Sequence, residues 1–264
     1  MDWGMKNRMS RIFKAKDGRT VMLAVDHGYF QGPTTGLIKP AETLAPLAPL
    51  ADTLMLTRGV LRNCVDAGLD VPVVLRVSGG SSILKEDLSD EEVTVSMKDA
   101  VRLNVSGVAM SVFVGSAHER QTIKGLSDLV DEANEYGIPV LAVTAVGKEM
   151  VRDARYLGLA CRIAAEMGAS VVKTYHCENF ESVVAGCPVP VVIAGGKKLA
   201  EKAALELTFN AMRDGARGVD MGRNIFQSDC PVGMMKAVRA IVHDGATVAQ
   251  GNDIYLAEKN RKAR

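Results

Sequence analysis

Thr20-Val21-Met22-Leu23-Ala24-Val25-Asp26-His27-Gly28 is the stretch from which the fold is predicted, because an apolar run ends here in polar side chains and a glycine. An apolar run without alternation is typical of a strand that is buried on both faces, as in a parallel sheet covered by helices. Seven similar runs follow, at residues 53–56, 71–75, 107–114, 138–143, 170–172, 189–193 and 218–221. The chain therefore carries eight candidate strands.

Helical patterns separate these strands, most clearly at residues 126–136, 155–167, 199–214 and 232–242. Alternation of strand and helix predicts an α/β protein, and eight repeats predict a single (β/α)8 TIM barrel, with a doubly wound open sheet as the alternative. The 264 residues fit one barrel, and no Pro/Ser-rich linker divides them, so we expect one domain over residues 1–264. Residues 78–99 are polar and charged, which predicts an extended loop that either serves the site or is a solvated insertion.

Composition narrows the classes of function. The 32 basic and 31 acidic residues nearly cancel, so no overall field favours nucleic acid or a membrane surface. No apolar stretch of membrane-spanning length and no apolar N-terminal segment is found, which predicts a cytoplasmic protein. The five cysteines are scattered, the four histidines lack ligand spacing, and no GxSxG or HExxH motif occurs. We therefore expect no disulfide framework and no metal.

Lys173 is the residue that indicates the chemistry. In a barrel, polar residues at the carboxyl ends of strands converge on the active site. Strand alternation from Val171 points Lys173 into the barrel, where a charged amine is unfavourable and a neutral amine can attack a ketone. The alternative is an inward lysine that pairs with a carboxylate and does no chemistry.

Asp26 and His27 follow the first strand. A carboxylate at this position can act as general base or acid, although an aspartate in Asp-His-Gly can also simply fix a turn. A lone histidine at the rim is as compatible with a structural role as with a catalytic one.

Glycines at the ends of the last two strands predict a phosphate site. Gly195-Gly196 and Gly222 lie on the two loops that usually bind phosphate in barrels, and Arg223 adds a charged donor. Lys197 and Lys198 can add positive charge nearby. The pattern is not a P-loop, because the glycine spacing and the following Ser or Thr are missing.

Four strings resemble the archaeal-type class I aldolase family: Val25-Asp26-His27-Gly28, Val172-Lys173-Thr174, Ala194-Gly195-Gly196 and Met221-Gly222-Arg223-Asn224-Ile225-Phe226-Gln227. Longer strings at residues 2–5, 27–37 and 185–190 are similar to a thiolase-like subgroup of that family. The resemblance implies a Schiff base on Lys173, Asp26 as acid or base, phosphate on the glycine loops with Arg223, and a homo-oligomeric ring.

One departure bears on the reaction. Fructose-bisphosphate aldolases of the family carry a tyrosine as proton donor where this chain has Thr144-Ala145-Val146-Gly147, and a threonine is a poor general acid. The resemblance therefore favours acetyl transfer from a phosphorylated pentanedione to coenzyme A, a partner for which the sequence shows no motif of its own. The alternatives are a retro-aldol or transaldol reaction on ketose phosphates, as in archaeal aromatic biosynthesis, and a phosphosugar-binding regulator, which would not need Lys173.

Overall fold

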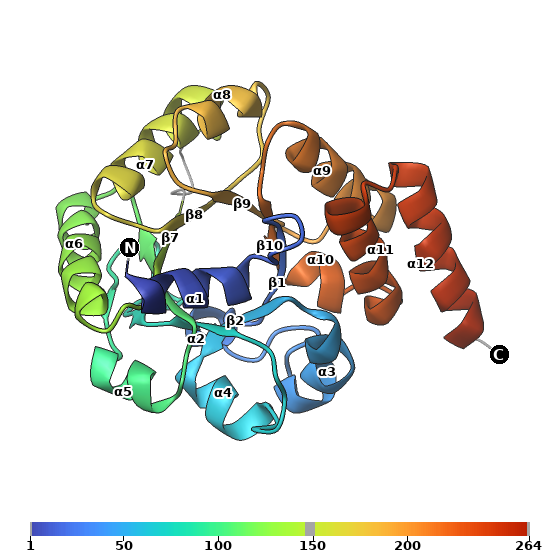
Figure 1. Cartoon of the computed structure of the whole chain (residues 1–264), viewed down its shortest axis with the longest axis horizontal. Helices are drawn as coiled ribbons and strands as arrows, with labels where there is room; N and C mark the ends of the chain where they lie inside the picture. Colours follow the sequence, from blue (N-terminus) through green and yellow to red (C-terminus); the bar gives the residue numbers. More distant parts are fainter. Residues whose placement is uncertain (1, 146–150, 263–264) are drawn as a thin grey trace.

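Eight parallel strands close into a barrel in this computed structural model, which describes residues 2–145 and 151–262. The strands are β1 (Thr20–Ala24), β2 (Thr53–Thr57), β3 (Val73–Arg76), β6 (Gly107–Val112), β7 (Val140–Thr144), β8 (Val171–Thr174), β9 (Val191–Ala194) and β10 (Gly218–Met221). Their order around the barrel is β1-β10-β9-β8-β7-β6-β3-β2 (Figure 1). The prediction of a barrel is confirmed, and the open sheet is excluded because β1 pairs with β10.

Helices surround the strands. They are α2 (Gly28–Gln31), α3 (Pro40–Leu47), α4 (Arg58–Cys64), α5 (Met97–Arg102), α6 (Glu119–Glu135), α7 (Ala154–Glu166), α8 (Phe180–Ala185), α9 (Glu201–Arg213), α10 (Arg223–Phe226), α11 (Pro231–Asp244) and α12 (Val248–Lys262), with a 3-10 turn at Ala48–Leu50. In α6, Leu126, Leu129, Val130 and Ala133 form one buried stripe at helical spacing. The helix begins at Glu119, before the predicted residue 126. The prediction missed its first two turns because they are largely polar and show little apolar periodicity.

The strand residues that point outward pack against the helices. Those that point inward fill the amino-terminal half of the barrel. Met22, Met55, Val74, Leu141 and Val171 belong to this inner cluster. Helix α1 (Trp3–Ile12) lies across the amino-terminal mouth of the barrel, and Ile12 and Phe13 join the same cluster (Figure 1). This apolar cluster fills the amino-terminal half of the barrel, whereas the charged inward residues Lys173 and Asp220 lie toward the carboxyl ends of their strands.

Residues 78–99 are more structured than predicted. Strands β4 (Ser78–Gly79) and β5 (Glu92–Val93) pair antiparallel, and α5 begins at Met97, where Ser96 accepts a hydrogen bond from the Asp99 amide. The predicted loop is present at residues 80–91, but the two short strands at its ends make it a hairpin, and the last part of the segment enters a helix. Two-residue strands are too short for sequence periodicity to reveal.

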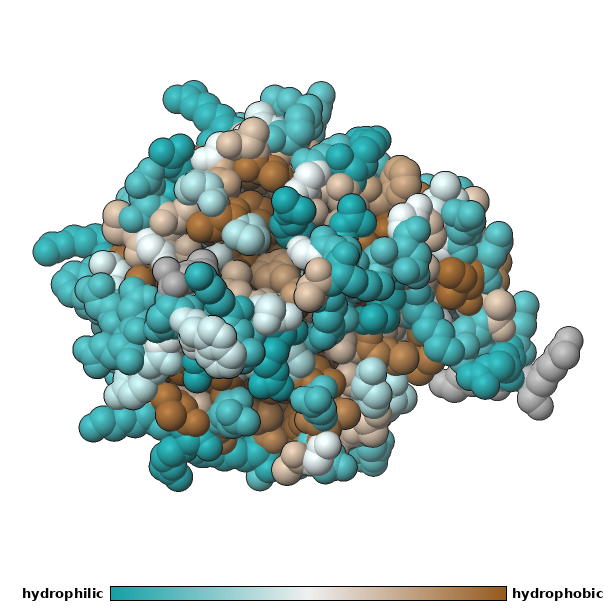
Figure 2. Space-filling model, viewed as in Figure 1, coloured by the Kyte–Doolittle hydropathy of each residue, from teal (hydrophilic) through white to brown (hydrophobic). Residues whose placement is uncertain are grey.

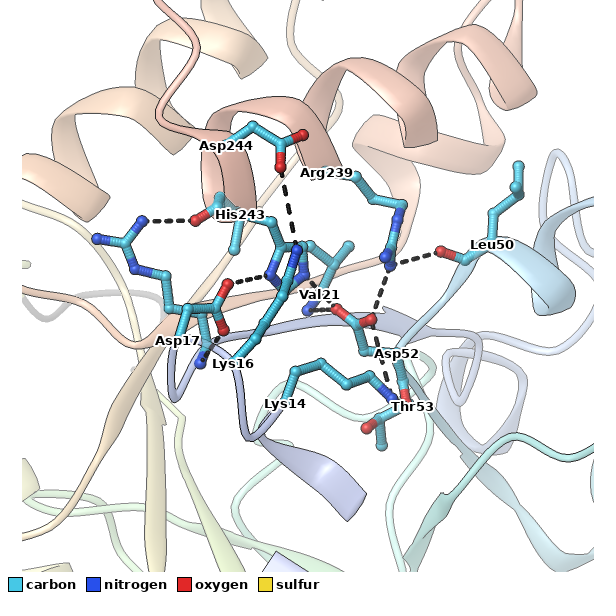
Figure 3. Close-up of polar contacts among 12 residues, drawn as sticks. Lys14, Lys16, Asp17, Val21, Leu50, Asp52, Thr53, Arg239, His243 and Asp244 are labelled. Carbon is cyan, nitrogen blue, oxygen red and sulfur yellow. Dashed lines mark hydrogen bonds and ion pairs between the residues drawn. The ribbon is translucent and has the colours of Figure 1, made fainter. Parts of the chain in front are cut away.

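A polar cluster holds the amino-terminal ends of β1 and β2 to α11 (Figure 3). The Asp52 carboxylate accepts hydrogen bonds from the Val21 amide at 2.7 Å and from Arg239 at 2.8 Å, and lies 2.6 Å from His243 Nε2. His243 Nδ1 lies 2.7 Å from Asp17. Asp52 and His243 are almost fully buried, so their polar atoms need hydrogen-bond partners within the protein, and these contacts supply them. The cluster therefore holds α11 to the first strands.

The large apolar side chains that are most exposed among the described residues are spread over different segments. On the face that carries α1, hydrophilic residues predominate and hydrophobic ones show in separate patches (Figure 2). The most exposed large apolar side chains, Trp3, Ile38, Leu84 and Val151, belong to different segments. In the described ranges, every helix is too short or too polar to cross a bilayer. The predicted oligomeric ring stays a prediction.

Candidate active site

A cavity of about 940 Å³ opens at the carboxyl ends of the strands. Every barrel strand except β2 contributes to its wall, and the hairpin segment covers one side of it with Ser81, Leu88, Ser89 and Glu91. Its size and position are those of a small-molecule site in a barrel. All eight residues predicted for the site line this one cavity: Asp26, His27, Thr144, Lys173, Gly195, Gly196, Gly222 and Arg223.

Lys173 reaches into the cavity from β8. The strand lies between β7 and β9, so that Lys173 is in register with Val143 and Val192. Its Nζ lies 2.9 Å from Oδ2 of Asp220 and 3.7 Å from Sδ of Met55, and the side chain is 9% exposed. The predicted inward orientation is found, and so is a carboxylate partner.

Asp220 on β10 is the residue that sequence reasoning missed. Its side chain is fully buried, and apart from the ion pair with Lys173 neither of its oxygens has a hydrogen-bond partner in the described part of the chain. Burial raises the pKa of this carboxyl, although the charge of Lys173 opposes the shift. The available signal was an aspartate inside an apolar strand, Gly218-Val219-Asp220-Met221, where alternation turns it inward when Val219 and Met221 pack outward.

Asp26 is held by a different cation. Arg76 Nε, at the end of β3, donates a hydrogen bond to Oδ2 of Asp26 at 2.9 Å, and both side chains are buried. Burial alone would raise the pKa of Asp26, but the positive charge of Arg76, followed by those of Lys173 and His27, holds it below the ordinary value. Asp26 is therefore an anion across the neutral range.

Arg76 is fixed in turn by residues of β6, α2 and the hairpin, where its Nη1 donates to Ser78 at 3.4 Å. Its Nη1 donates to Ser111 at 2.8 Å, and its guanidinium lies 5.2 Å from the centre of the Tyr29 ring. Tyr29 donates to the buried carboxylate of Glu91 at 2.6 Å, and Ser78 donates to the other oxygen of Glu91 at 2.7 Å. The segment that the sequence left open between a site loop and a solvated insertion thus supports the site.

His27 lines the cavity as a neutral imidazole. Its Nδ1 lies 3.9 Å from Asp26, which is beyond hydrogen-bond distance, and its ring meets the edge of Phe226 with centroids 5.7 Å apart. Burial lowers the pKa of His27 to about 4, against the attraction of Asp26. A neutral ring next to an anion can accept or relay a proton without adding positive charge to the site.

The hydroxyl of Thr144 points to the neighbouring strand. It lies 2.8 Å from the hydroxyl of Thr174 and 3.2 Å from the carbonyl oxygen of Lys173, whereas Val143 occupies the inward position in register with Lys173. Thr144 therefore contacts the backbone of Lys173, and its part in proton transfer stays a prediction. Val146 and Gly147, from which its place was counted, lie outside the described residues.

The glycine loops and Arg223 form the wall of the cavity at the ends of β9 and β10. Asn224 joins the two loops, because its Nδ2 donates to the Gly195 carbonyl at 2.7 Å and its Oδ1 accepts from the Leu199 amide at 2.8 Å. Gly196 has a φ of +67°, and a Cβ at Gly222 would lie 2.3 Å from the Ala24 carbonyl oxygen. Both positions therefore require glycine.

Arg223 lines this wall, and its buried Nε has no hydrogen-bond partner within the described ranges. The two nearby lysines, Lys197 and Lys198, differ from Arg223 in their position. Lys197 is exposed, Lys198 pairs with Glu201 at 2.8 Å, and neither lines the cavity. An anion at the glycine loops would therefore meet Arg223 as its nearest candidate partner among these cations.

Residues suited to metal binding do not gather in the parts of the chain that the structure describes: no group of three or more His, Cys, Asp and Glu side chains has that arrangement.

His176, which precedes Cys177, lies 2.8 Å from Asp214. Burial raises the pKa of the Cys177 thiol. Within the described ranges the lysine remains the strongest candidate nucleophile.

Comparisons with known proteins agree with this geometry. A family model described as DeoC/LacD family aldolase matches residues 20–228. The chain is 60% identical over 260 residues to the 3-hydroxy-5-phosphonooxypentane-2,4-dione thiolase of Escherichia coli K12, and 58% identical over 261 residues to that of Yersinia pseudotuberculosis strain IP 31758. Each match covers 98% of this chain and 89% of the relative. A Schiff-base-forming fructose-1,6-bisphosphate aldolase superposes with a TM-score of 0.82 at 26% identity, over 90% of this chain and 100% of that one.

Proposed function

The chain belongs to the DeoC/LacD family of aldolases, and from this premise we propose that it catalyses the reaction of the 3-hydroxy-5-phosphonooxypentane-2,4-dione thiolases. In this reaction an acetyl group passes from the phosphorylated diketone to coenzyme A. The observation that carries the proposal is the position of Lys173, whose amine lies in the wall of a cavity that also contains the glycine loops.

The connectivity of the substrate determines which ketone the lysine activates. Carbon 3 lies between the ketones at carbons 2 and 4, and carbon 5 carries the phosphate. Cleavage between carbons 2 and 3 leaves an electron pair on carbon 3. An iminium between Lys173 and carbon 4 can take up that pair as an enamine, so the imine forms on the ketone next to the phosphate end. The glycine loops and Arg223 bind the phosphate in this arrangement.

The remaining steps transfer the acetyl group. The sulfur of coenzyme A attacks carbon 2, the bond between carbons 2 and 3 breaks, and acetyl-CoA forms. The thiol proton balances the protonation of carbon 3, and water then releases a triose phosphate from Lys173. Asp26, held ionised by Arg76, lines the same cavity as Lys173 and is proposed to carry these protons, with His27 as a neutral relay.

The iminium supplies the electron sink in this mechanism, and we propose that the enzyme uses neither a metal nor an organic cofactor. Activity should survive incubation with EDTA. Loss on chelation, with recovery on addition of zinc, would instead indicate a Lewis acid. By the family resemblance we also propose a cytoplasmic homo-oligomer, for which light scattering on a sizing column gives the number of subunits.

Borohydride reduction tests the proposed function. The protein is mixed with the phosphorylated diketone, reduced, digested and mapped by mass spectrometry, and the adduct is expected on Lys173. A parallel assay follows acetyl-CoA with and without coenzyme A, and compares fructose 1,6-bisphosphate as substrate. Cleavage of the sugar phosphate without coenzyme A would favour the retro-aldol alternative. An adduct on Lys197 or Lys198 would contradict the assignment of the lysine.

A further inference from the structure

Lys173 and Asp220 form an isolated buried pair. Their contact of 2.9 Å joins β8 to β10 across the upper barrel, with Met55 on the other side of the amine. Asp220 is fully buried, and no hydrogen bond from the described residues holds either of its oxygens. Nearly every buried polar atom in a protein has at least one hydrogen-bond partner, and an exception often marks a catalytic group. This one is left with a single partner, the amine itself.

The charge states of the two groups are linked. When Lys173 loses its proton or becomes part of a neutral intermediate, an ionised Asp220 would be a buried anion without a counter-charge at hydrogen-bond distance, which is strongly unfavourable. The other charged groups around it are Asp26 and Arg76, and these two neutralise each other at 2.9 Å. The proton that leaves the amine therefore has a nearby acceptor that becomes more basic as the amine becomes neutral.

We propose that Asp220 is the catalytic residue that takes the proton from the Lys173 amine and returns it to the hydroxyl that leaves as water when the imine forms. The inference rests on the proposed imine at Lys173 and assigns its proton carrier. Asp220 touches the reacting nitrogen, and the leaving hydroxyl is attached to the carbon bonded to that nitrogen, so both sites of proton transfer lie within reach of one carboxyl.

The steps balance in atoms and charge. The Lys173 ammonium gives a proton to the Asp220 carboxylate, and the neutral amine attacks the ketone carbon. A second proton moves from nitrogen to the former carbonyl oxygen, which gives a neutral carbinolamine. Asp220 then protonates the hydroxyl, the carbon–oxygen bond breaks, and water leaves. The products are an iminium, an ionised Asp220 and one water.

Asp26 is less suited to this role. Arginine stays charged at all accessible pH values, so its hydrogen bond with Asp26 keeps that carboxylate ionised whatever the state of Lys173. The two carboxylates therefore have environments that push their protonation apart, which is the arrangement by which enzymes divide acid and base tasks. Asp220 serves imine formation, and Asp26 is left for the protons at carbon.

The test compares the rate of imine formation in wild type and Asp220→Asn. Dihydroxyacetone phosphate, a ketone phosphate, is the probe, and samples quenched with borohydride at successive times are mapped for the Lys173 adduct. Asparagine keeps the shape but cannot accept the proton, so trapping at pH 7 should slow by about 10²–10⁴-fold. The binding of inorganic phosphate should change by less than about threefold, because the glycine loops are untouched.

The pH profile separates proton transfer from mere positioning. In Asp220→Asn the proton must leave to solvent, so the trapping rate should rise about tenfold per pH unit between pH 6 and 8, whereas the wild-type rate changes much less. In Asp220→Ala, added formate should restore part of the rate. Asp99→Asn is the control, since Asp99 also pairs with arginines but lies outside the cavity, and it should trap at the wild-type rate.

Lys173→Met gives a measurement that does not depend on folding of an Asp220 variant. Without the amine, Asp220 should be protonated at neutral pH, and infrared difference spectra against wild type should show the carbonyl band of a neutral carboxyl. Absence of that band, or trapping of Asp220→Asn at the wild-type rate and pH profile, would overturn the proposal. Failure of wild type to trap at Lys173 would instead overturn the proposed function.

Discussion

The Arg76 guanidinium lies 2.9 Å from the Asp26 carboxylate, inside a barrel whose upper wall also holds the Lys173–Asp220 pair. Two cations and two carboxylates thus line one cavity, and each cation has a different carboxylate. The division matters because Arg76 never gives up its charge, whereas Lys173 must do so to react.

Replacing Arg76 should shift the acid limb of the pH–rate profile. In wild type the charge of Arg76 holds the pKa of Asp26 below 3.8, and in Arg76→Met burial would raise it. The carboxylate would then gain its proton at a higher pH. The acid limb of the kcat profile should therefore shift to higher pH. Arg76→Lys keeps the charge and should shift it less. An unmoved acid limb in Arg76→Met would show that Asp26 does not limit the rate.

Arg223→Ala should weaken binding of the phosphorylated substrate. The change removes a charge-assisted hydrogen bond of about 1.5–3 kcal/mol, so KM should rise by roughly 10- to 150-fold, while borohydride trapping at saturation is preserved. Lys197→Ala is the matched control, because Lys197 is an exposed cation outside the cavity. If Arg223→Ala raised the KM of a dephosphorylated analogue as much as that of the phosphorylated substrate, the arginine would not be the phosphate ligand.

Two glycine-to-alanine changes should have opposite effects on stability. A Cβ at Gly222 would lie 2.3 Å from the Ala24 carbonyl oxygen and 2.5 Å from His27, so Gly222→Ala should destabilise the fold by about 1–3 kcal/mol. Gly158, inside α7, has open space around it, and Gly158→Ala should stabilise by about 0.5–1 kcal/mol. Urea unfolding measures both. If Gly222→Ala left the free energy of unfolding unchanged, the ends of β1 and β10 would be free to move apart and make room for the Cβ.

His243→Gln should destabilise the protein more at pH 6 than at pH 9. Burial opposes the charged ring, but hydrogen bonds with Asp52 and Asp17 raise the pKa of His243 above 6.5. Its contribution is therefore complete below about pH 6.5 and is lost as the pH rises through the folded-state pKa. The pKa values of Asp17 and Asp52 are lowered from 3.8, so their contribution is complete above about pH 3.8 and is lost in acid.

The cost of His243→Gln near pH 6 is expected to be about 1–3 kcal/mol, because buried Asp52 loses one charged hydrogen-bond partner but keeps Arg239 and the Val21 amide. Thermal unfolding from pH 5 to 9 gives the difference from wild type. His118→Gln is the comparison, because His118 is partly exposed and lies 3.7 Å from Asp90 at the surface. A difference that stays constant over this range would contradict a charged His243.

The barrel was predictable from the sequence because parallel strands covered by helices leave long apolar runs. The hairpin at β4 and β5 was not, since its two-residue strands depend on the contact of Ser78 with Ser111 of β6 and on the hydrogen bond between Ser78 and Glu91. Among site residues, Lys173 could be placed by alternation from Val171. Asp220 obeys the same alternation, but its importance depends on a contact with another strand, which no local pattern records.

Thr144 shows the limit of counting along the chain. Its position at the end of β7 was anticipated and it lines the cavity, yet its hydroxyl is engaged by Thr174 and the Lys173 carbonyl. A shift of one residue along a strand reverses the direction of the side chain. The register that places Val143 beside Lys173 is a property of strand pairing, and the sequence of one strand does not contain it.

Closure of the barrel between β1 and β10 has a consequence for how the enzyme acquires activity. Thr20 pairs with Gly218 and Leu23 with Met221, so β1, which precedes Asp26, and β10, which carries Asp220, become neighbours only through contacts very distant in sequence. Such contacts require a large loss of chain entropy before they are rewarded. A refolding chain can therefore regain helical circular dichroism well before it regains imine formation, and the return of trapping marks the moment at which the ring of strands is complete.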